Sequence, residues 1–308
     1  MLEIGVQTKG LLPEKSPMLA MKQIKDAGFS RIDINLDVFI KMSELNSGET
    51  CPFFDKSLDE LCDVFTPYVE AMIATGVKPS QMHVPYPVRV EGKAEQSAYM
   101  QSVVIPKSLV IAEFLGVPYV VIHPFKMQYT HGRDAERKEN IAYFKMLIPI
   151  AKQCGVKICL ENLYENVGGR ITEGVCADPE DAIWYIDTLN EIAGEELFGL
   201  CLDTGHLQLV KREPYEYIKR LGNRIKILHL HENNFVNDLH QMPYTFGTKE
   251  KQGLDWNGII RGLRETQYEG TLSFETFPCV KGFPKAMTDA VLKTIYDIGN
   301  YLAEEIRL

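Results

Sequence analysis

The sequence lacks an excess of positive charge and lacks long hydrophobic runs. Its 308 residues include 33 Lys and Arg against 42 Asp and Glu, which gives a formal net charge of −9. This balance argues against a general nucleic-acid binder, because affinity for a polyanion rests on a positive field. No apolar run approaches the ~18 residues of a membrane span, and the first residues do not resemble a secretory leader. We therefore expect a cytoplasmic protein without a membrane or nucleic-acid partner.

Motifs for several common chemistries are also missing. The seven cysteines are odd in number and contain no CxxC pair, which predicts reduced thiols and no disulfide framework. The sequence has no GxSxG segment that would mark a serine nucleophile. It also has no glycine-rich phosphate loop after an early strand-like segment. The sequence therefore gives no support to a phosphorylated substrate.

Strand-like and helix-like segments alternate from one end of the chain to the other. Eight such pairs predict an α/β protein, a (β/α)8 TIM barrel in a single domain spanning residues 1–308. A doubly wound open sheet is the alternative, although it would usually carry the missing phosphate loop. The strands are expected at 3–7, 31–36, 81–84, 119–123, 157–161, 198–203, 226–231 and 271–275. The helices are expected at 17–28, 56–76, 95–116, 134–155, 178–193, 211–222, 255–267 and 284–305.

Three of the connections that follow predicted strands are long, at residues 37–55, 162–177 and 232–254. In a barrel, every connection from a strand to the next helix lies at the C-terminal face, where active sites are built. We expect these three segments to form lids or substrate-binding loops.

Four ligand-type side chains close four consecutive predicted strands. Glu161, Asp203, His229 and Glu275 end the fifth to eighth strands. An isolated acid at a strand end is usually a cap or an ion-pair partner, but the ends of adjacent parallel strands converge in a barrel. Three carboxylates and one imidazole suit Mn²⁺, Mg²⁺ or Co²⁺, and Zn²⁺ is also compatible. The pattern predicts one divalent metal ion per chain.

Further polar side chains fall at or just beyond the predicted strand ends. Those with ligand chemistry are His83, His123, His206, His231, Asp238 and His240. Asn162 directly follows Glu161, where it can orient a ligand by a hydrogen bond or contact the substrate. Lys9 and Lys126 follow the first and fourth strands, where a cation can meet an anionic group of a substrate.

The order and spacing of HVPYP, VIHP, LEN, LDTGH, HLHEN, DLH and ET resemble the xylose isomerase-like barrel superfamily, from residue 4 to residue 275. That group contains sugar and sugar-phosphate isomerases and epimerases, the ketose 3-epimerases and the endonuclease IV repair enzymes. The resemblance implies that Glu161, Asp203, His229 and Glu275 hold a single metal. It also implies that His206 contacts the substrate and that His231 faces the substrate or supports a ligand. Tyr86, at the expected barrel mouth, is a candidate for stacking on a sugar.

The endonuclease IV pattern uses more metal ions and finds matching residue types here. His83 and His123 would share Glu161, while His206, Asp238 and His240 would serve a further ion. The alternative is that these residues contact substrate or support one metal, and the sequence leaves both open.

The chain departs from the ketose 3-epimerase pattern at two positions. That pattern has a glutamate six residues after the first metal glutamate, where this chain has Val167, with Glu165 nearby. It also has an arginine six residues past the metal histidine, where this chain has Phe235. Close identity with those epimerases is therefore not expected.

The resemblance implies a metal-dependent sugar isomerase or epimerase of carbohydrate metabolism. Glu161 and Glu275 would move a proton at a carbon next to a carbonyl, through an ene-diolate. The alternatives are an endonuclease IV-like phosphodiesterase, a dehydratase-type lyase acting on an inositol or another polyol, and a non-catalytic sugar-binding barrel. The expected partner is a small sugar; barrels of this class often form homo-oligomers, which the sequence leaves open.

Overall fold

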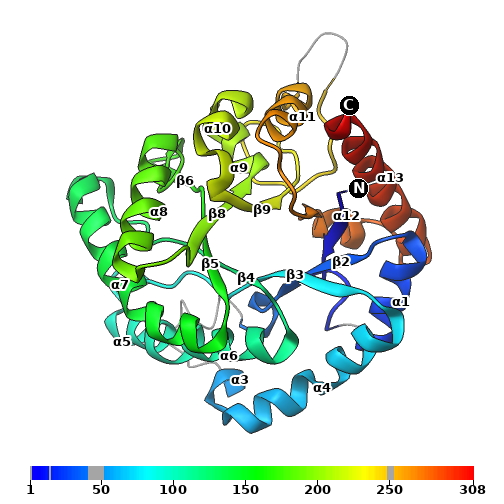
Figure 1. The fold of residues 1–308 in the computed structure, drawn as a ribbon, viewed down its shortest axis with the longest axis horizontal. Coiled ribbons are helices and arrows are strands. Elements are labelled where there is room, and N and C mark those ends of the chain that lie inside the picture. The colour runs from blue at the N-terminus through cyan, green and yellow to red at the C-terminus, as the bar shows by residue number, and fades with distance from the viewer. Residues whose placement is uncertain (1, 14, 41–51, 248–252) are drawn as a thin grey trace.

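The computed structural model describes residues 2–13, 15–40, 52–247 and 253–308. Eight parallel strands form a ring surrounded by helices (Figure 1), which confirms the predicted barrel. The strands, in ring order from β10, are β10 Leu272–Phe274, β1 Ile4–Gln7, β2 Arg31–Asn35, β3 Lys78–His83, β4 Tyr119–Ile122, β5 Lys157–Glu161, β8 Phe198–Asp203 and β9 Ile225–His229.

Backbone hydrogen bonds between the segment just after β9 and the segment around β10 close the ring. The Leu230 N–H donates to the carbonyl of Ser273 at 2.8 Å, and the Glu275 N–H donates to the carbonyl of Leu230 at 3.2 Å. In the described residues, the bridge between Leu230 and Phe274 is the pairing that joins these two strand regions. Closure of the ring therefore places the end of β10 beside the end of β9.

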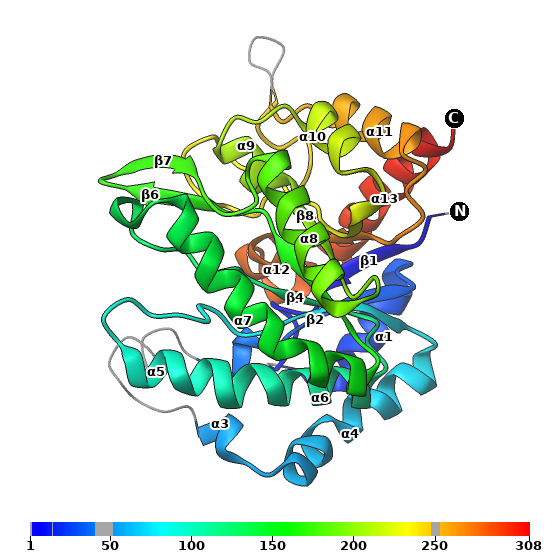
Figure 2. The ribbon, with the colours of Figure 1, turned by 60° about the vertical axis from the view of Figure 1, so that its left-hand side comes forward.

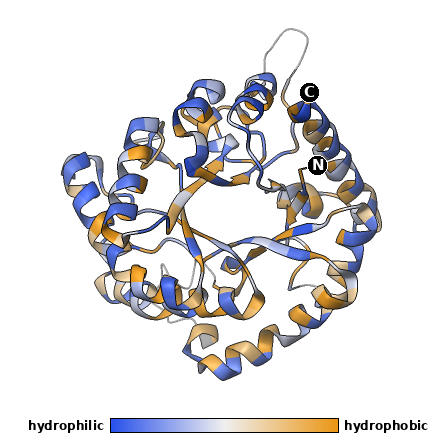
Figure 3. Cartoon of the chain, viewed as in Figure 1, coloured by the Kyte–Doolittle hydropathy of each residue, from blue (hydrophilic) through white to orange (hydrophobic). Residues whose placement is uncertain are grey.

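Helices cover the outside of the ring (Figures 1 and 2). Hydrophobic and hydrophilic residues alternate along them (Figure 3), as expected of helices with one face on a core. The long ones are α1 Pro17–Ala27, α4 Leu58–Thr75, α6 Ile105–Leu115, α7 Arg133–Cys154, α8 Pro179–Ala193, α10 Pro214–Leu221, α11 Trp256–Glu265 and α13 Thr288–Arg307. The short ones are α3 Pro52–Asp55, α5 Ala94–Tyr99, α9 Thr204–Leu209 and α12 Phe277–Gly282.

Local sequence explains where these helices begin and end. At α4, the Ser57 hydroxyl accepts from the N–H of Glu60 at 3.2 Å, and the Glu60 carboxylate accepts from the N–H of Ser57 at 2.7 Å. This reciprocal capping box satisfies two N–H groups that a helix start leaves unpaired. Gly76 ends the same helix at φ 72°, a left-handed conformation that glycine adopts without steric cost.

The helical stretch Ala94–Leu115 is long and apolar enough, by length and composition alone, to cross a membrane. It instead lies between α4 and α7 on the outside of the barrel. Its buried side chains include Ile105, Leu109 and Ala112, which belong to the main hydrophobic core. The apolar character of this stretch is therefore used in packing within the fold.

The structure describes one of the three long connections in full and six of the seven cysteines. Residues 162–177, a loop in the sequence prediction, contain an antiparallel hairpin of β6 Tyr164–Val167 and β7 Arg170–Glu173. The hairpin projects from the C-terminal side of the barrel (Figure 2). Much of 37–55 and part of 232–254 lie outside the described residues. The six described cysteines are free, as expected, and Cys51 lies outside the described residues.

Helix α13 approaches the barrel closely at Gly299. A Cβ atom at this position would lie 2.7 Å from Ile4 Cγ2 and 2.8 Å from the Phe274 ring. We expect Gly299→Ala to lower the free energy of unfolding by about 1–3 kcal/mol, because both neighbours belong to the packed core and must shift. Chemical denaturation measures the change. Gly282→Ala is the control, since nothing lies within 4 Å of its added Cβ; equal effects of the two substitutions would contradict the packing argument.

Candidate metal centre

The four predicted ligands come together at the C-terminal end of the barrel. One ligand atom from each of Glu161, Asp203, His229 and Glu275 lies within 4.8 Å of the others, and all four residues are buried. His229 Nδ1 is 3.2 Å from Glu161 Oε1 and 3.2 Å from Glu275 Oε2. It is 4.0 Å from Asp203 Oδ2. One imidazole nitrogen therefore faces three carboxylates.

Three buried carboxylates at one point need positive charge nearby, because a buried charge without compensation is strongly destabilising. In the described part of the chain, no Lys or Arg forms an ion pair with Glu161, Asp203 or Glu275; their partners are imidazoles. This oxygen and nitrogen donor set fits a divalent cation such as Mn²⁺, Mg²⁺, Co²⁺ or Zn²⁺.

The pKa shifts reflect this charge distribution. Burial opposes the charged form of His229, yet the surrounding anionic groups, with Glu275 and Glu161 among them, raise its pKa well above the usual range. Burial also disfavours ionised Glu275, but His229 and His240 lower the pKa of that carboxyl to about 2. The pKa of Glu161 is held well below its usual range against the effect of burial, by His123 and His229. Both glutamates are therefore carboxylates at neutral pH.

Three polar residues inside neighbouring strands orient these ligands, and the sequence analysis missed them. Asp33 Oδ2, on β2, lies 3.0 Å from His229 Nε2, so the imidazole turns Nδ1 toward the carboxylates. Gln81 on β3 donates to the same Asp33 oxygen at 3.1 Å. Gln7 on β1 donates to Glu275 Oε1 at 2.8 Å. The available signal was an acidic side chain between two apolar residues of a predicted strand, as Asp33 is between Ile32 and Ile34.

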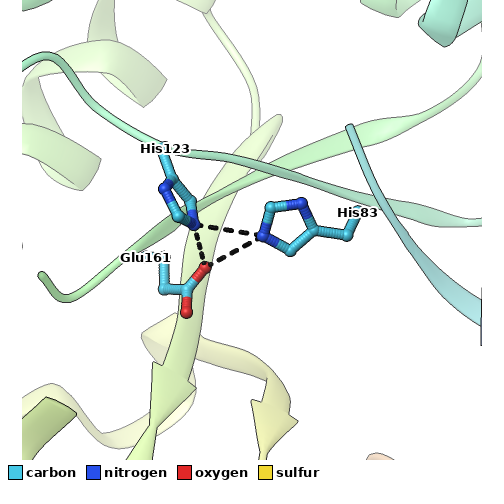
Figure 4. Close-up of side chains that lie close together, drawn as sticks. All are labelled: His83, His123 and Glu161. Atoms are coloured by element: carbon cyan, nitrogen blue, oxygen red, sulfur yellow. Dashed lines mark hydrogen bonds and ion pairs between the residues drawn. The ribbon is translucent and has the colours of Figure 1, made fainter. Parts of the chain in front are cut away.

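His83 and His123 form a second group around Glu161 (Figure 4). His123 Nε2 lies 2.8 Å and His83 Nε2 lies 3.5 Å from Glu161 Oε2. The two Nε2 atoms are 3.1 Å apart. His83 Nδ1 lies 2.7 Å from the carbonyl of Val84, which leaves Nε2 free for the group. A second cation could bind here by sharing Glu161 with the first site.

The remaining predicted residues gather on the other side of the quartet. Asp238 Oδ2 lies 3.4 Å from His206 Nε2 and 3.2 Å from His240 Nε2. Burial opposes protonation of both imidazoles, but nearby carboxylates raise the pKa of His206 to about 10 and that of His240 to about 9. His231 Nε2 is 2.9 Å from Asp203 Oδ2, so His231 supports a predicted ligand. His231, His240 and Glu275 also form a compact group of potential ligands.

A pocket of about 200 Å³ opens beside this cluster. Of the predicted quartet, Glu161 and Glu275 line it, whereas Asp203 and His229 do not. Tyr86 also lines it, with its ring 4.5 Å from the His123 ring. The other polar residues of the lining are His83, Arg89, His123, Lys126, Tyr164, His206, Asp238 and His240.

The Asn162 side chain contacts the backbone of a predicted ligand, Asp203, which agrees with the first of the two roles predicted for it. Its side-chain amide donates to the carbonyl of Asp203 at 2.9 Å and accepts from the N–H of Asp203 at 2.8 Å. The side chain is buried and is not part of the pocket lining, so the structure supports the ligand-positioning role rather than the predicted substrate contact. Its role is to fix the end of β8 against the end of β5.

The two predicted cations also differ from each other. Lys9 forms an ion pair with Asp37 at 2.6 Å and is therefore already compensated. Lys126 lines the pocket, with Nζ 4.9 Å from the centre of the Tyr164 ring.

Comparisons with known proteins agree with this architecture. A family model described as xylose isomerase-like TIM barrel matches residues 68–295. The D-psicose 3-epimerase of Enterocloster bolteae is 24% identical over 176 residues, which cover 56% of this chain and 51% of that protein. The chain spans about half the length of the curated relatives it matches.

Two solved structures share the barrel across nearly the whole chain. The D-allulose 3-epimerase from Methylomonas sp. has a TM-score of 0.69 at 15% identity and covers 98% of each chain. The IOLI protein, solved with a bound zinc atom, has a TM-score of 0.67 at 19% identity and covers 100% of each chain. At these identities the likeness shows the fold.

Asp33 gives a test of the ligand geometry that leaves the four ligands unchanged. We expect Asp33→Asn to weaken Mn²⁺ binding about 10–100-fold, because the neutral amide no longer fixes the orientation of His229 or raises its basicity. Isothermal titration calorimetry measures the affinity. Asp187→Asn is the control, since Asp187 pairs with Arg224 on the surface at 2.7 Å. Unchanged affinity in a folded Asp33→Asn variant would show that Asp33 does not act through His229.

Proposed function

Because the chain belongs to the xylose isomerase-like TIM barrel family, we propose that it is a divalent-metal-dependent sugar isomerase or epimerase. The observation that carries the proposal is the division within the quartet. All four ligand atoms lie within 4.8 Å of one another, but only Glu161 and Glu275 of the four line the pocket. This arrangement suits two carboxylates that hold a cation and also reach a bound sugar.

Glu161, Asp203, His229 and Glu275 would hold the metal. When bound, the metal would supply Lewis-acid polarisation of the sugar oxygens next to the reacting carbon. Asp203 and His229 lie behind the pocket lining and are fixed by His231 and Asp33 at 2.9 and 3.0 Å. Their task is to hold the ion in place.

Glu161 and Glu275 would carry the proton. They extend from β5 and from the end of β10, which are separated by β8 and β9 around the ring, so they reach the pocket from different sides. Both are ionised at neutral pH, so either can accept a proton from the carbon next to a carbonyl. For an epimerisation, the second glutamate would first take up a proton from solvent and then deliver it to the opposite face of that carbon, while the first glutamate keeps the proton that it removed. Return of the proton to the neighbouring carbon would give an isomerisation.

The remaining lining residues would bind hydroxyl groups of the sugar. His206 Nδ1 lies 2.9 Å from the carbonyl of Asn162, so its Nε2 is directed toward Asp238 and the pocket. Tyr86 offers a ring face beside His123. A keto sugar substrate is supported by the D-psicose 3-epimerase relative and by the D-allulose 3-epimerase neighbour.

We expect Glu161→Gln and Glu275→Gln each to lower turnover by about 10²–10⁴-fold, because each removes a proton carrier. Deuterium incorporation from ²H₂O into a panel of ketohexoses with added Mn²⁺ measures the proton transfer. Circular dichroism checks that both variants remain folded. Retained activity in both variants would reject these roles.

Metal loss and loss of the proton carrier can be told apart with Asp203→Asn. Asp203 is a proposed ligand outside the pocket lining, so excess Mn²⁺ should recover part of the activity of this variant. The same excess should not restore Glu161→Gln or Glu275→Gln. Glu139→Gln, on the exposed side of α7, is the control that should keep full activity.

A second candidate function is an endonuclease IV-like phosphodiesterase, favoured by the two further groups of potential ligands, His83–His123–Glu161 and His231–His240–Glu275. Such an enzyme would use several ions to hold and attack a phosphate. We expect elemental analysis to find about one metal ion per chain, because the quartet brings together the largest number of ligands and all four are buried. About three ions per chain, with cleavage of abasic-site DNA, would favour the phosphodiesterase instead.

A further inference from the structure

Two cationic side chains line the pocket without an anionic partner. Neither Arg89 nor Lys126 forms an ion pair with any carboxylate in the described part of the chain. The Nη1 atom of Arg89 is buried and has no hydrogen-bond acceptor among the described residues. A buried donor left without an acceptor carries a desolvation penalty. Lys9 shows the contrast, since Asp37 compensates it at 2.6 Å.

The two cations come from neighbouring strand-to-helix connections. Arg89 follows β3 and Lys126 follows β4, and these strands pair directly through His83 and Val121. The same two connections carry His83 and His123, whose ring centres are 4.8 Å apart. Arg89 and Lys126 therefore share one wall of the pocket with this histidine pair.

No acid of the pocket lining forms an ion pair with these cations in the described part of the chain. Burial lowers the pKa of Lys126, and the charges of Glu161 and Asp238 oppose this shift from a longer distance. Glu161, Asp238 and Glu275 line the pocket, but each lies within 4.0 Å of an imidazole. Two of the three are also the proposed metal ligands that reach the sugar. Once the metal and the imidazoles are counted, Arg89 and Lys126 are the charges in the lining that a ligand must satisfy.

We infer that the substrate is an anionic sugar, whose carboxylate or phosphate group is bound by Arg89 and Lys126 while its carbonyl end lies at Glu161 and Glu275. This inference rests on the proposed function. A guanidinium presents a planar set of donors that matches either anion, and an ammonium adds a point charge. The Arg89 guanidinium and the Lys126 ammonium, which both line the pocket, would contact the oxygens of this group.

The test compares matched sugars on the Mn²⁺-loaded protein. D-fructose and D-psicose are each measured beside their 6-phosphates and their C6 carboxylates by isothermal titration calorimetry. We expect at least about tenfold tighter binding of one anionic form, which corresponds to a charge-assisted hydrogen bond. Preference for the phosphates or for the carboxylates identifies the anion.

Arg89→Gln and Lys126→Gln should each reduce the preference for the anionic sugar and leave binding of the neutral sugar nearly unchanged. Lys93→Gln is the control, because Lys93 lies in the same connection as Arg89 and outside the pocket lining. Loss of the preference in at least one of the two variants supports the inference. Equal affinity for neutral and anionic sugars, a preference that survives in both variants, or no binding of any sugar overturns it.

The affinity ranking does not require turnover, so the two proposals can fail separately. Anionic sugars that bind through Arg89 but exchange no proton would sustain the anion subsite and reject the epimerase. Proton exchange with neutral sugars alone would do the reverse.

Discussion

Closure of the barrel forces three carboxylates and one imidazole to a single buried point. Like charges at this distance cannot all remain ionised without positive charge between or beside them. In the described residues, histidine side chains contact every carboxylate of the quartet and can supply this positive charge. A divalent cation is the group that would satisfy the same carboxylates together, and this need explains why polar residues such as Asp33 and Gln7 occupy the interior of β2 and β1.

The sequence predicted the barrel and the quartet for one physical reason. Parallel strands place their C-terminal ends at one rim, so ligands that close consecutive apolar segments converge once the sheet closes. The sequence did not predict the roles of Asp33 and Gln81 because both lie within strands. The contact partner of such a residue can be identified only when the register of the strands is known. The sequence did not predict the hairpin β6–β7 because its strands are short, polar and partly exposed. The Gly168–Gly169 turn is the one sequence feature that indicates it. The position of Asn162 directly after Glu161 also did not reveal that its side chain points toward the Asp203 backbone.

The division between held and exposed ligands links the fold to the chemistry. His231 contacts the Asp203 side chain and Asp33 contacts the His229 ring. Asn162 also hydrogen-bonds to both the N–H and the carbonyl of Asp203. Glu161 and Glu275 have the same burial but face the pocket. The strands therefore fix the positions of the four candidate ligands, whereas the connections after β3 and β4 supply other residues of the pocket lining.

The same residues can support two chemistries, and the number of cations decides between them. If one ion binds, His83 and His123 are left to contact sugar hydroxyls beside Glu161, and the pocket is lined by imidazoles and two uncompensated cations. If three bind, these imidazoles become ligands and can no longer contact the substrate. Arg89 and Lys126 suit an anion in either case, whether it belongs to a sugar or to a phosphodiester. The number of bound cations is therefore the property that separates the two proposals.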